Sequence, residues 1–162
     1  MNEAEKRKKR LCFTGHRPEK LHHNEAEMCG ILRKAIDDAM ANGFTTFISG
    51  MARGVDIWAA EIVLEKKRVN PEVRLICALP YPSFEKSWRF SWQERYGSIL
   101  MQADYIKTIC PVFSKESYQR RNEWMVDHSA RVIAIYNGTA GGTKKTIDYA
   151  RMQGVKVDIY EA

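Results

Sequence analysis

Three glycine-containing segments hold the residues of this sequence best suited to chemistry with a phosphorylated ligand. The first is Gly15-His16-Arg17, which follows the apolar run 11–14. Gly15 permits a tight turn and a close approach of the backbone, Arg17 could grip a phosphate through two hydrogen bonds, and His16 could donate a third. The alternative is a Gly-Pro turn that leaves the arginine in solvent, and this segment alone fits both.

The second segment connects a β-type run to a helical one. Residues 49–56 read Ser-Gly-Met-Ala-Arg-Gly-Val-Asp, and the positions of interest are Ser49, Gly50, Met51, Gly54 and Asp56. Backbone N–H groups at a helix N-terminus, with no bulky side chain in front of them, form an anion site. The spacing matches neither the dinucleotide-binding G-x-G-x-x-G nor the Walker A loop. Asp56 could accept a hydrogen bond from a ribose hydroxyl, or it could simply complement the helix dipole.

The third segment, residues 137–146, has the composition most typical of a phosphate-binding loop. Its Gly138, Gly141, Gly142 and Thr143 precede a helical run that begins with two lysines. Backbone amides, the hydroxyl of Thr143 and the helix dipole could together hold a phosphate. Lysines at a helix N-terminus oppose the dipole, so their presence indicates a compensating anion. A flexible loop with a lysine-decorated helix start is the alternative.

The elements around these segments alternate between strand and helix along the whole chain. Apolar and β-branched runs predict strands, and apolar residues spaced three and four apart predict helices. The expected strands are 11–14, 45–48, 73–79, 105–109, 131–136 and 155–160, and the expected helices are 24–42, 54–68, 84–102, 115–130 and 142–153. This order predicts a single-domain, Rossmann-like α/β fold in three layers, with a mainly parallel sheet and helices on both faces. Such folds bind ligands outside the carboxyl ends of their strands, so we expect the three segments to share one rim.

Composition limits the other classes of function. The chain has 162 residues and a formal net charge of +6, which suits one domain. Residues 1–10 form a basic tail, either solvated or in contact with nucleic acid, and residues 11–162 form the Rossmann-like domain. The four cysteines lie far apart and include no C-x-x-C pair, so no zinc or redox site is signalled. No signal peptide or membrane span is indicated, and we expect a reduced, cytoplasmic protein without a metal site.

The second and third segments resemble motifs of known families. Residues 49–56 resemble the S-G-x-A-x-G-[IV]-D signature of DprA-type proteins. Arg121-Asn122-Glu123-Trp124-Met125, followed by Gly141-Gly142-Thr143, resembles the R-x-x-x-M and glycine motifs of LOG-type proteins. Three further segments are similar to the YpsA-like group: Trp58-Ala59-Ala60-Glu61, the aromatic segment 81–88, and Gln102-Ala103-Asp104-Tyr105. From Leu11 onward the chain therefore resembles the SLOG superfamily, and most closely its YpsA-like branch.

The resemblance implies that residues 11–162 are a Rossmann-like nucleotide-binding domain, which binds a nucleotide or a nucleotide-derived ligand such as one related to NAD or ADP-ribose. It specifies no cofactor. LOG-type proteins remove the base from nucleoside monophosphates with the help of an arginine that corresponds to Arg121, and Asn122 would face the same cleft. Thr146 stands here at the position of the glutamate that they require. The sequence therefore assigns no catalytic residue. Arg121 and Glu123 are the remaining candidates, and Asp148 is an alternative to Glu123, although neither carboxylate fits the motif position. DprA-type proteins imply a different partner, single-stranded DNA.

An aromatic-rich stretch bears on the choice of partner. Its rings are Tyr81, Phe84, Trp88, Phe90 and Trp92, and they lie among basic residues, a combination that stacks the bases of single-stranded nucleic acid. The rings could also pack in the core, which is the simplest interpretation, or stack on the base of one small ligand. We expect a nucleotide-like small molecule as the main partner and no membrane partner. Nucleic acid and assembly into a homo-oligomer stay open.

Overall fold

Six parallel strands form the sheet at the centre of the molecule. The computed structural model describes residues 1–162. The strands are β1 (Arg10–Thr14), β2 (Thr46–Ser49), β3 (Arg74–Leu79), β4 (Tyr105–Thr108), β5 (Arg131–Tyr136) and β6 (Lys156–Glu161). They lie in the order β4-β3-β2-β1-β5-β6, and every pairing is parallel. Strand order reverses between β1 and β5, because the chain moves outward to β4 and then returns to the other side of β1.

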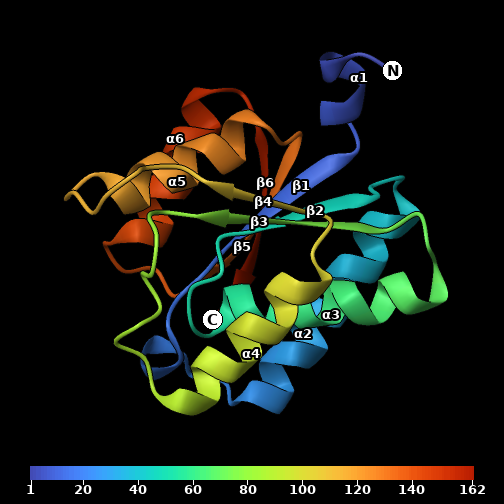
Figure 1. The fold of residues 1–162 in the computed structure, drawn as a ribbon. Helices are drawn as coiled ribbons and strands as arrows, with labels where there is room; N and C mark the ends of the chain where they lie inside the picture. The colour runs from blue at the N-terminus through green and yellow to red at the C-terminus, as the bar shows by residue number, and fades with distance from the viewer.

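Helices cover both faces of this sheet, so the predicted Rossmann-like α/β fold is confirmed. The helices are α1 (Glu3–Arg7), the 3-10 turn η1 (Pro18–Lys20), α2 (Glu25–Ala41), α3 (Val55–Val69), α4 (Phe90–Gln102), α5 (Ser117–Asp127) and α6 (Gly142–Met152). Figure 1 shows α2, α3 and α4 together on one face and α5 and α6 on the other, which gives three layers. None of the helices has the length and apolar character needed to cross a membrane.

Each face of the sheet buries its own apolar cluster, because successive strand residues point to opposite faces. In β1, Leu11 and Phe13 join a cluster of 28 buried residues under α2, α3 and α4. Cys12 joins a cluster of 10 buried residues under α5 and α6. Strands buried on both faces have continuous apolar sequences, which is why the sequence predicted them.

The predicted helix 84–102 is wrong in its first part. α4 begins only at Phe90, and residues 82–87 form turns. Ser83 has a φ of 66°, a left-handed conformation that a right-handed helix excludes. The ring of Phe84 is buried and packs 5.3 Å from the ring of Trp88. Burial of aromatic rings in a turn therefore overrides the helical spacing. The other predicted elements lie within three residues of their predicted limits, whereas α1 and η1 were not predicted.

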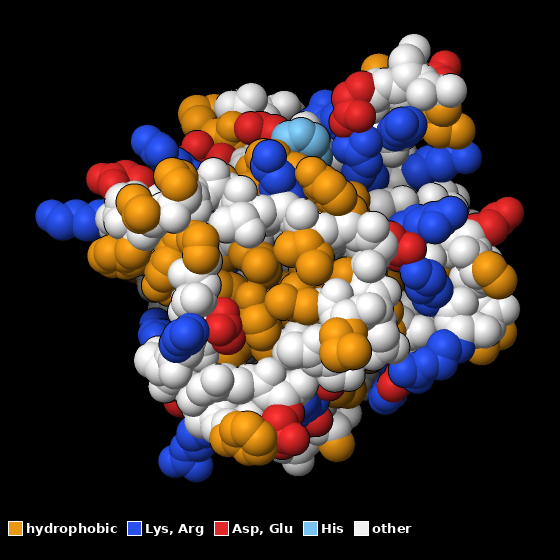
Figure 2. All heavy atoms as spheres, viewed as in Figure 1, with side chains coloured by type: hydrophobic (Ala, Val, Ile, Leu, Met, Phe, Trp, Pro, Cys, Tyr) orange, Lys and Arg blue, Asp and Glu red, His pale blue; other side chains and the backbone are white.

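Two surface features lie outside the layered core: the N-terminal helix α1 and an apolar hollow (Figures 1 and 2). The short helix α1 stands away from the sheet beside the start of β1 (Figure 1), and Arg10 of β1 pairs with Glu3 of α1 at 2.7 Å. Figure 2 shows apolar side chains gathered in a hollow between the two helical layers, whereas Lys and Arg lie mostly around the periphery.

Candidate functional site

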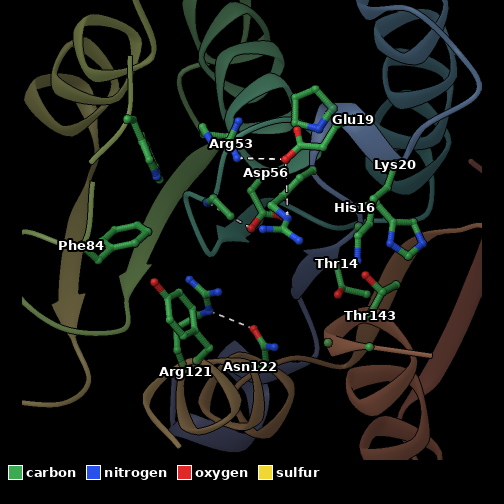
Figure 3. A pocket seen from close by; sticks show the side chains of 18 of the residues that line it. Thr14, His16, Glu19, Lys20, Arg53, Asp56, Phe84, Arg121, Asn122 and Thr143 are labelled. Atoms are coloured by element: carbon green, nitrogen blue, oxygen red, sulfur yellow. Dashed lines mark hydrogen bonds and ion pairs between the residues drawn. The ribbon is translucent and has the colours of Figure 1, made fainter. Parts of the chain in front are cut away.

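A cavity of about 1160 Å³ opens at the carboxyl end of the sheet. It lies between the loops after β1 and β2, the segment 81–92 and the starts of α5 and α6 (Figure 3). β1 and β5 mark the reversal of strand order, so this main cavity occupies the place where folds of this type bind ligands.

The structure brings most of the predicted site residues to the main cavity. Those that line it are Gly15, His16, Arg17, Asp56, Arg121, Asn122, Gly141, Gly142 and Thr143. Those that do not line it are Ser49, Gly50, Met51, Gly54 and Gly138, together with Glu123 and Thr146. The three segments therefore share one rim, and their role in ligand binding stays a prediction.

Three glycines at this rim allow neighbouring loops to approach one another. A Cβ atom on Gly15 would lie 2.7 Å from the side chain of Val55, the first residue of α3. A Cβ atom on Gly54 would lie 2.9 Å from the carbonyl oxygen of His16. A Cβ atom on Gly50 would lie 2.9 Å from the guanidinium carbon of Arg121. Gly54 also has a φ of 90°, which favours glycine. Gly50 and Gly54 thus shape the cavity without lining it.

His16 joins the loop after β1 to the loop after β5. Its Nε2 accepts a hydrogen bond from the backbone N–H of Asn137 at 3.0 Å, which places the ring proton on Nδ1. Burial, assisted by the charge of Lys20, lowers the pKa of His16, so the ring is neutral at pH 7. The Nδ1 proton is then available to an acceptor in the main cavity, which His16 lines.

Hydrogen bonds fix the loop between β2 and α3. The hydroxyl of Ser49 donates to the carbonyl oxygen of Asp56 at 2.8 Å and accepts from the N–H of Met51 at 3.1 Å. Met51 is fully buried and has a φ of 62°, a conformation that few residues other than glycine adopt. Ser49 and Met51 therefore hold the loop in shape, which explains why they do not line the cavity.

Asp56, in the first turn of α3, has one carboxylate oxygen without a partner. Its Oδ2 accepts a hydrogen bond from the N–H of Ala52 at 3.3 Å, whereas its Oδ1 is buried and has no hydrogen-bond partner. Burial raises the pKa of Asp56 to about 6, although the positive charge of Arg121 opposes the rise. Buried polar atoms are normally hydrogen-bonded, so Oδ1 is an unsatisfied acceptor of a residue that lines the cavity.

Arg121 of α5 places a fixed positive charge in the wall of the cavity. The side chain is only 4% exposed. Its Nη1 donates to the carbonyl oxygen of Gly50, and its Nε donates to Oδ1 of Asn122 at 2.8 Å. Burial lowers the pKa of Arg121, and the charge of Asp56 opposes this effect. A guanidinium nevertheless stays protonated at neutral pH.

The start of α6 presents hydrogen-bond donors to the cavity. Gly141 precedes the helix with a φ of 143°, and the first N–H groups of any α-helix lack an intrahelical acceptor. The hydroxyl of Thr143 lines the cavity beside them. Thr146 is fully buried, and its hydroxyl donates to the carbonyl oxygen of Gly142 at 2.8 Å. Lys144 pairs with an exposed carboxylate on α6, so this lysine does not indicate an anion in the cavity.

Positive charge exceeds negative charge in the lining. The cationic residues are Arg17, Lys20, Arg53, Arg89 and Arg121, and the carboxylates are Glu19 and Asp56. Glu19 pairs with Arg53 at 3.1 Å and lies 3.8 Å from Arg17. The excess charge suits an anionic ligand. No group of three or more His, Cys, Asp or Glu side chains is arranged to hold a metal ion.

Six Phe, Tyr and Trp residues line the main cavity. One of them, Phe13, lies in β1, and the other five are called the aromatic wall: Tyr81, Phe84, Trp88, Trp92 and Tyr118. Figure 3 shows Phe84 on the side of the cavity opposite Thr143. The hydroxyls of Tyr81 and Tyr118 lie 3.2 Å apart. Phe90, the remaining ring of the aromatic-rich stretch, is 73% exposed and does not line the cavity.

Several lining residues were not among the predicted site residues. Arg53 lies within the second glycine segment and Lys20 follows the first closely, so a wider window around each would have included them. Tyr118 precedes Arg121 by three residues on α5, a spacing that places both on one helix face. Arg89 lies within the aromatic-rich stretch, directly before α4, and also lines the cavity.

Known proteins share both the sequence pattern and the fold. The family model described as the YspA SLOG family, YpsA, matches residues 11–159. The SPbeta prophage-derived protein YoqJ of Bacillus subtilis strain 168 is 32% identical over 117 residues, which cover 65% of this chain and 68% of YoqJ.

Two solved structures of DNA processing protein A (DprA) are similar in fold. The Streptococcus pneumoniae protein superposes with a TM-score of 0.67 at 16% identity, over 95% of this chain and 50% of that chain. The Helicobacter pylori protein gives a TM-score of 0.64 at 18% identity, over 97% and 66%. This chain thus spans about half the length of the Streptococcus pneumoniae protein. Because the family match extends from residue 11 to residue 159, the chain belongs to the YpsA family of SLOG proteins.

Proposed function

We propose that this protein binds a nucleotide or a nucleotide-derived phosphorylated ligand in the main cavity, as a sensor or as a processing protein. The observation that carries the proposal is the excess of positive side chains in a cavity at the carboxyl rim of a parallel sheet. Its volume of about 1160 Å³ lies above the range of roughly 300–1,000 Å³ typical of small-molecule sites. A ligand related to NAD or ADP-ribose would fit this volume as well as a mononucleotide would.

The phosphate of the ligand would bind at the α6 side of the cavity. The helix N-terminus supplies unpaired N–H groups and a partial positive charge, both of which favour phosphate. Thr143, His16 and Arg17 line the same cavity, and each can donate a hydrogen bond. The Arg17 side chain is 56% exposed, so it can reorient toward a ligand.

The sugar of the ligand would bind near Asp56. A buried carboxylate oxygen without a partner raises the free energy of the empty protein, and a ribose hydroxyl would supply the missing donor. Binding would then also favour the ionised form of Asp56, because a hydrogen bond to a carboxylate lowers its pKa.

Thermal denaturation with added nucleotides tests the proposal. A ligand that binds only the folded protein raises Tm, so we expect a higher Tm with at least one member of a panel of nucleoside phosphates and NAD. Arg17→Ala should abolish the rise. Gly50→Val should do the same, because the added side chain would displace Arg121. Arg33→Ala, on α2 and outside the main cavity, should keep the rise. Unchanged stabilisation in both site variants would contradict the proposal.

Removal of the base from a nucleotide is a second candidate, because Arg121 lies in the cavity wall. Thr146, at the position of the LOG-type glutamate, is buried, and Glu123 does not line the cavity. The carboxylates in the lining are Asp56 and Glu19. Chromatography of nucleotides incubated with the protein tests this candidate. Release of free base that Arg121→Lys abolishes supports it, and no release from any nucleotide eliminates it.

Binding of single-stranded DNA is a third candidate. The solved Helicobacter pylori structure is described as showing a single-stranded DNA binding mode of that protein, and here aromatic rings lie beside basic residues in one cavity. We expect any such binding to weaken steeply with added salt, because phosphate contacts release counterions. Fluorescence anisotropy of a labelled oligonucleotide tests this. Absence of binding at low salt, or binding that salt does not affect, eliminates the candidate.

A further inference from the structure

We propose that the aromatic wall binds the base of the ligand, with a flat heterocycle stacked on the ring of Trp88. This inference rests on the proposed nucleotide function and extends it from the phosphate and the sugar to the base. It names the ligand class more narrowly: a nucleotide that carries an aromatic base, as opposed to a sugar phosphate or inorganic phosphate.

The rings of the wall hold one another in fixed orientations. Trp88 packs edge-to-face against Phe84 and Tyr96, with interplanar angles of 83° and 88°. Tyr81 packs edge-to-face against Phe84 and Tyr118, with centroid distances of 6.2 and 5.8 Å. Aromatic pairs favour this geometry. Because the rings are already ordered, stacking a base on them costs little conformational freedom.

Core packing accounts for only part of this wall. Phe84 of the wall is 6% exposed and belongs to the larger apolar cluster, as does Tyr96, which packs against Trp88. Trp88 and Tyr81 are only partly buried, and Tyr118 is 41% exposed. All three line the main cavity. Apolar ring surface that faces a water-filled cavity is unfavourable, and a stacked base would remove it from water.

The order of groups across the cavity matches the order of groups in a nucleotide. Figure 3 shows Thr143 and His16 on one side, Asp56 near the centre and Phe84 on the opposite side. A phosphate bound near Thr143 and a sugar bound at Asp56 therefore direct the base toward the wall. Arg89 follows Trp88 in the sequence and also lines the cavity. Its planar guanidinium can stack on the face of a bound base.

The stacking contact is measurable, because removing an aromatic platform weakens binding of a base. For a nucleotide that stabilises the wild-type protein, we expect Trp88→Leu to lower the affinity by about 10- to 100-fold. The same variant should bind ribose 5-phosphate with the affinity of the wild-type protein. Trp88→Phe should restore most of the affinity for the nucleotide. Isothermal titration calorimetry measures all three, and circular dichroism confirms that each variant is folded.

Tryptophan fluorescence gives a second readout that does not require truncation. Quenching of the wild-type emission by the nucleotide should be lost in Trp88→Phe and kept in Trp124→Phe, since Trp124 lies on α5 stacked on His128 and outside the cavity. Equal nucleotide affinity in Trp88→Leu and wild-type protein would overturn the base site while leaving the nucleotide function intact. Absence of nucleotide binding to the wild-type protein would overturn both proposals.

Discussion

Two cavities in this protein are lined by arginine, glutamate and tryptophan side chains, but the two differ in how far their charged groups are paired with one another. The main cavity lies at the carboxyl rim of the sheet, and a groove of about 330 Å³ lies between α2, α3 and α4. In the groove, Arg95 donates to Glu61 at 2.6 Å and to Glu25 at 3.0 Å, and Arg33 donates to Glu65 at 3.2 Å. In the main cavity, Asp56 keeps a buried oxygen without a partner, and the lining holds five cationic side chains against two carboxylates.

The comparison shows how a structural ion-pair network differs from a binding site. In the groove, Arg33 and Arg95 are paired with carboxylates, whereas Arg68 has no ion pair and the indole N–H of Trp58 is buried without a partner. The main cavity holds charge that the protein does not neutralise. Unpaired buried polar atoms cost free energy, and a ligand that pairs with them recovers it. The predictions below test this difference from the largest expected effect to the smallest.

Gly54→Ala should destabilise the protein by about 3 kcal/mol or more. Gly54 has a φ of 90°, and the new Cβ would lie 2.9 Å from the His16 carbonyl oxygen. Backbone strain and a steric clash would therefore both destabilise the folded state. Gly97→Ala on α4, beside the groove, is the matched control, because a Cβ there meets nothing within 4 Å. It should stabilise the protein by about 0.5–1 kcal/mol. Urea denaturation measures both. Similar stabilities for the two variants would show that the loops of the rim are not tightly joined.

Asp56→Asn should stabilise the empty protein at pH 8 by up to about 3 kcal/mol. Burial raises the pKa of Asp56 from 3.8 to about 6. Its contribution to stability is therefore fully present below pH 3.8 and is lost as the pH rises through about 6. Asparagine carries no charge to bury, so the gain over wild type should shrink as the pH falls from 8 to 4.

Thermal denaturation of both proteins from pH 4 to pH 8 checks this prediction. The same variant should bind the proposed ligand more weakly. Its side-chain NH₂ group would stand in place of Oδ1, and an NH₂ group cannot accept the hydrogen bond that a ligand hydroxyl would donate there. A stability difference that does not change with pH would mean that Asp56 is paired in solution, as the carboxylates of the groove are.

Glu61→Gln in the groove should cost about 1 kcal/mol, because it weakens a partly exposed network centred on Arg95. Arg33→Ala should cost less than about 1 kcal/mol, since both Arg33 and Glu65 are nearly half exposed. Neither variant should alter ligand binding. Chemical denaturation in low and high salt measures the cost, which salt should reduce. A loss of ligand binding in Arg33→Ala would remove the distinction between the two cavities.

The fold could be predicted from the sequence because its physics is local and periodic. The run at β1 is apolar on both faces and ends at Gly15, and α2 has regular apolar spacing and ends near Gly43. The start of α4 could not be predicted, because Ser83 adopts a left-handed conformation while Phe84 packs against distant rings. Helical spacing carries no information about such tertiary contacts.

The candidate site was predictable in position but not in detail. Parallel topology places the turns after β1, β2 and β5 at one rim, so Gly15, Asp56 and Thr143 meet there. Gly50 was predicted to approach a phosphate, and in the structure it makes room for Arg121, a contact between residues 71 positions apart. The sequence shows that Gly50 leaves space beside the backbone, but not whether a ligand or a side chain from another helix fills that space.

Isothermal titration of nucleotides into the wild-type protein, Arg17→Ala and Arg33→Ala tests the central claim most directly. The account predicts saturable binding of at least one phosphorylated nucleotide to the wild-type protein. It predicts a loss of affinity of about tenfold or more in Arg17→Ala, which removes a charged hydrogen bond to phosphate, and wild-type affinity in Arg33→Ala. Equal affinity in all three proteins, or no saturable binding of any nucleotide, would contradict it.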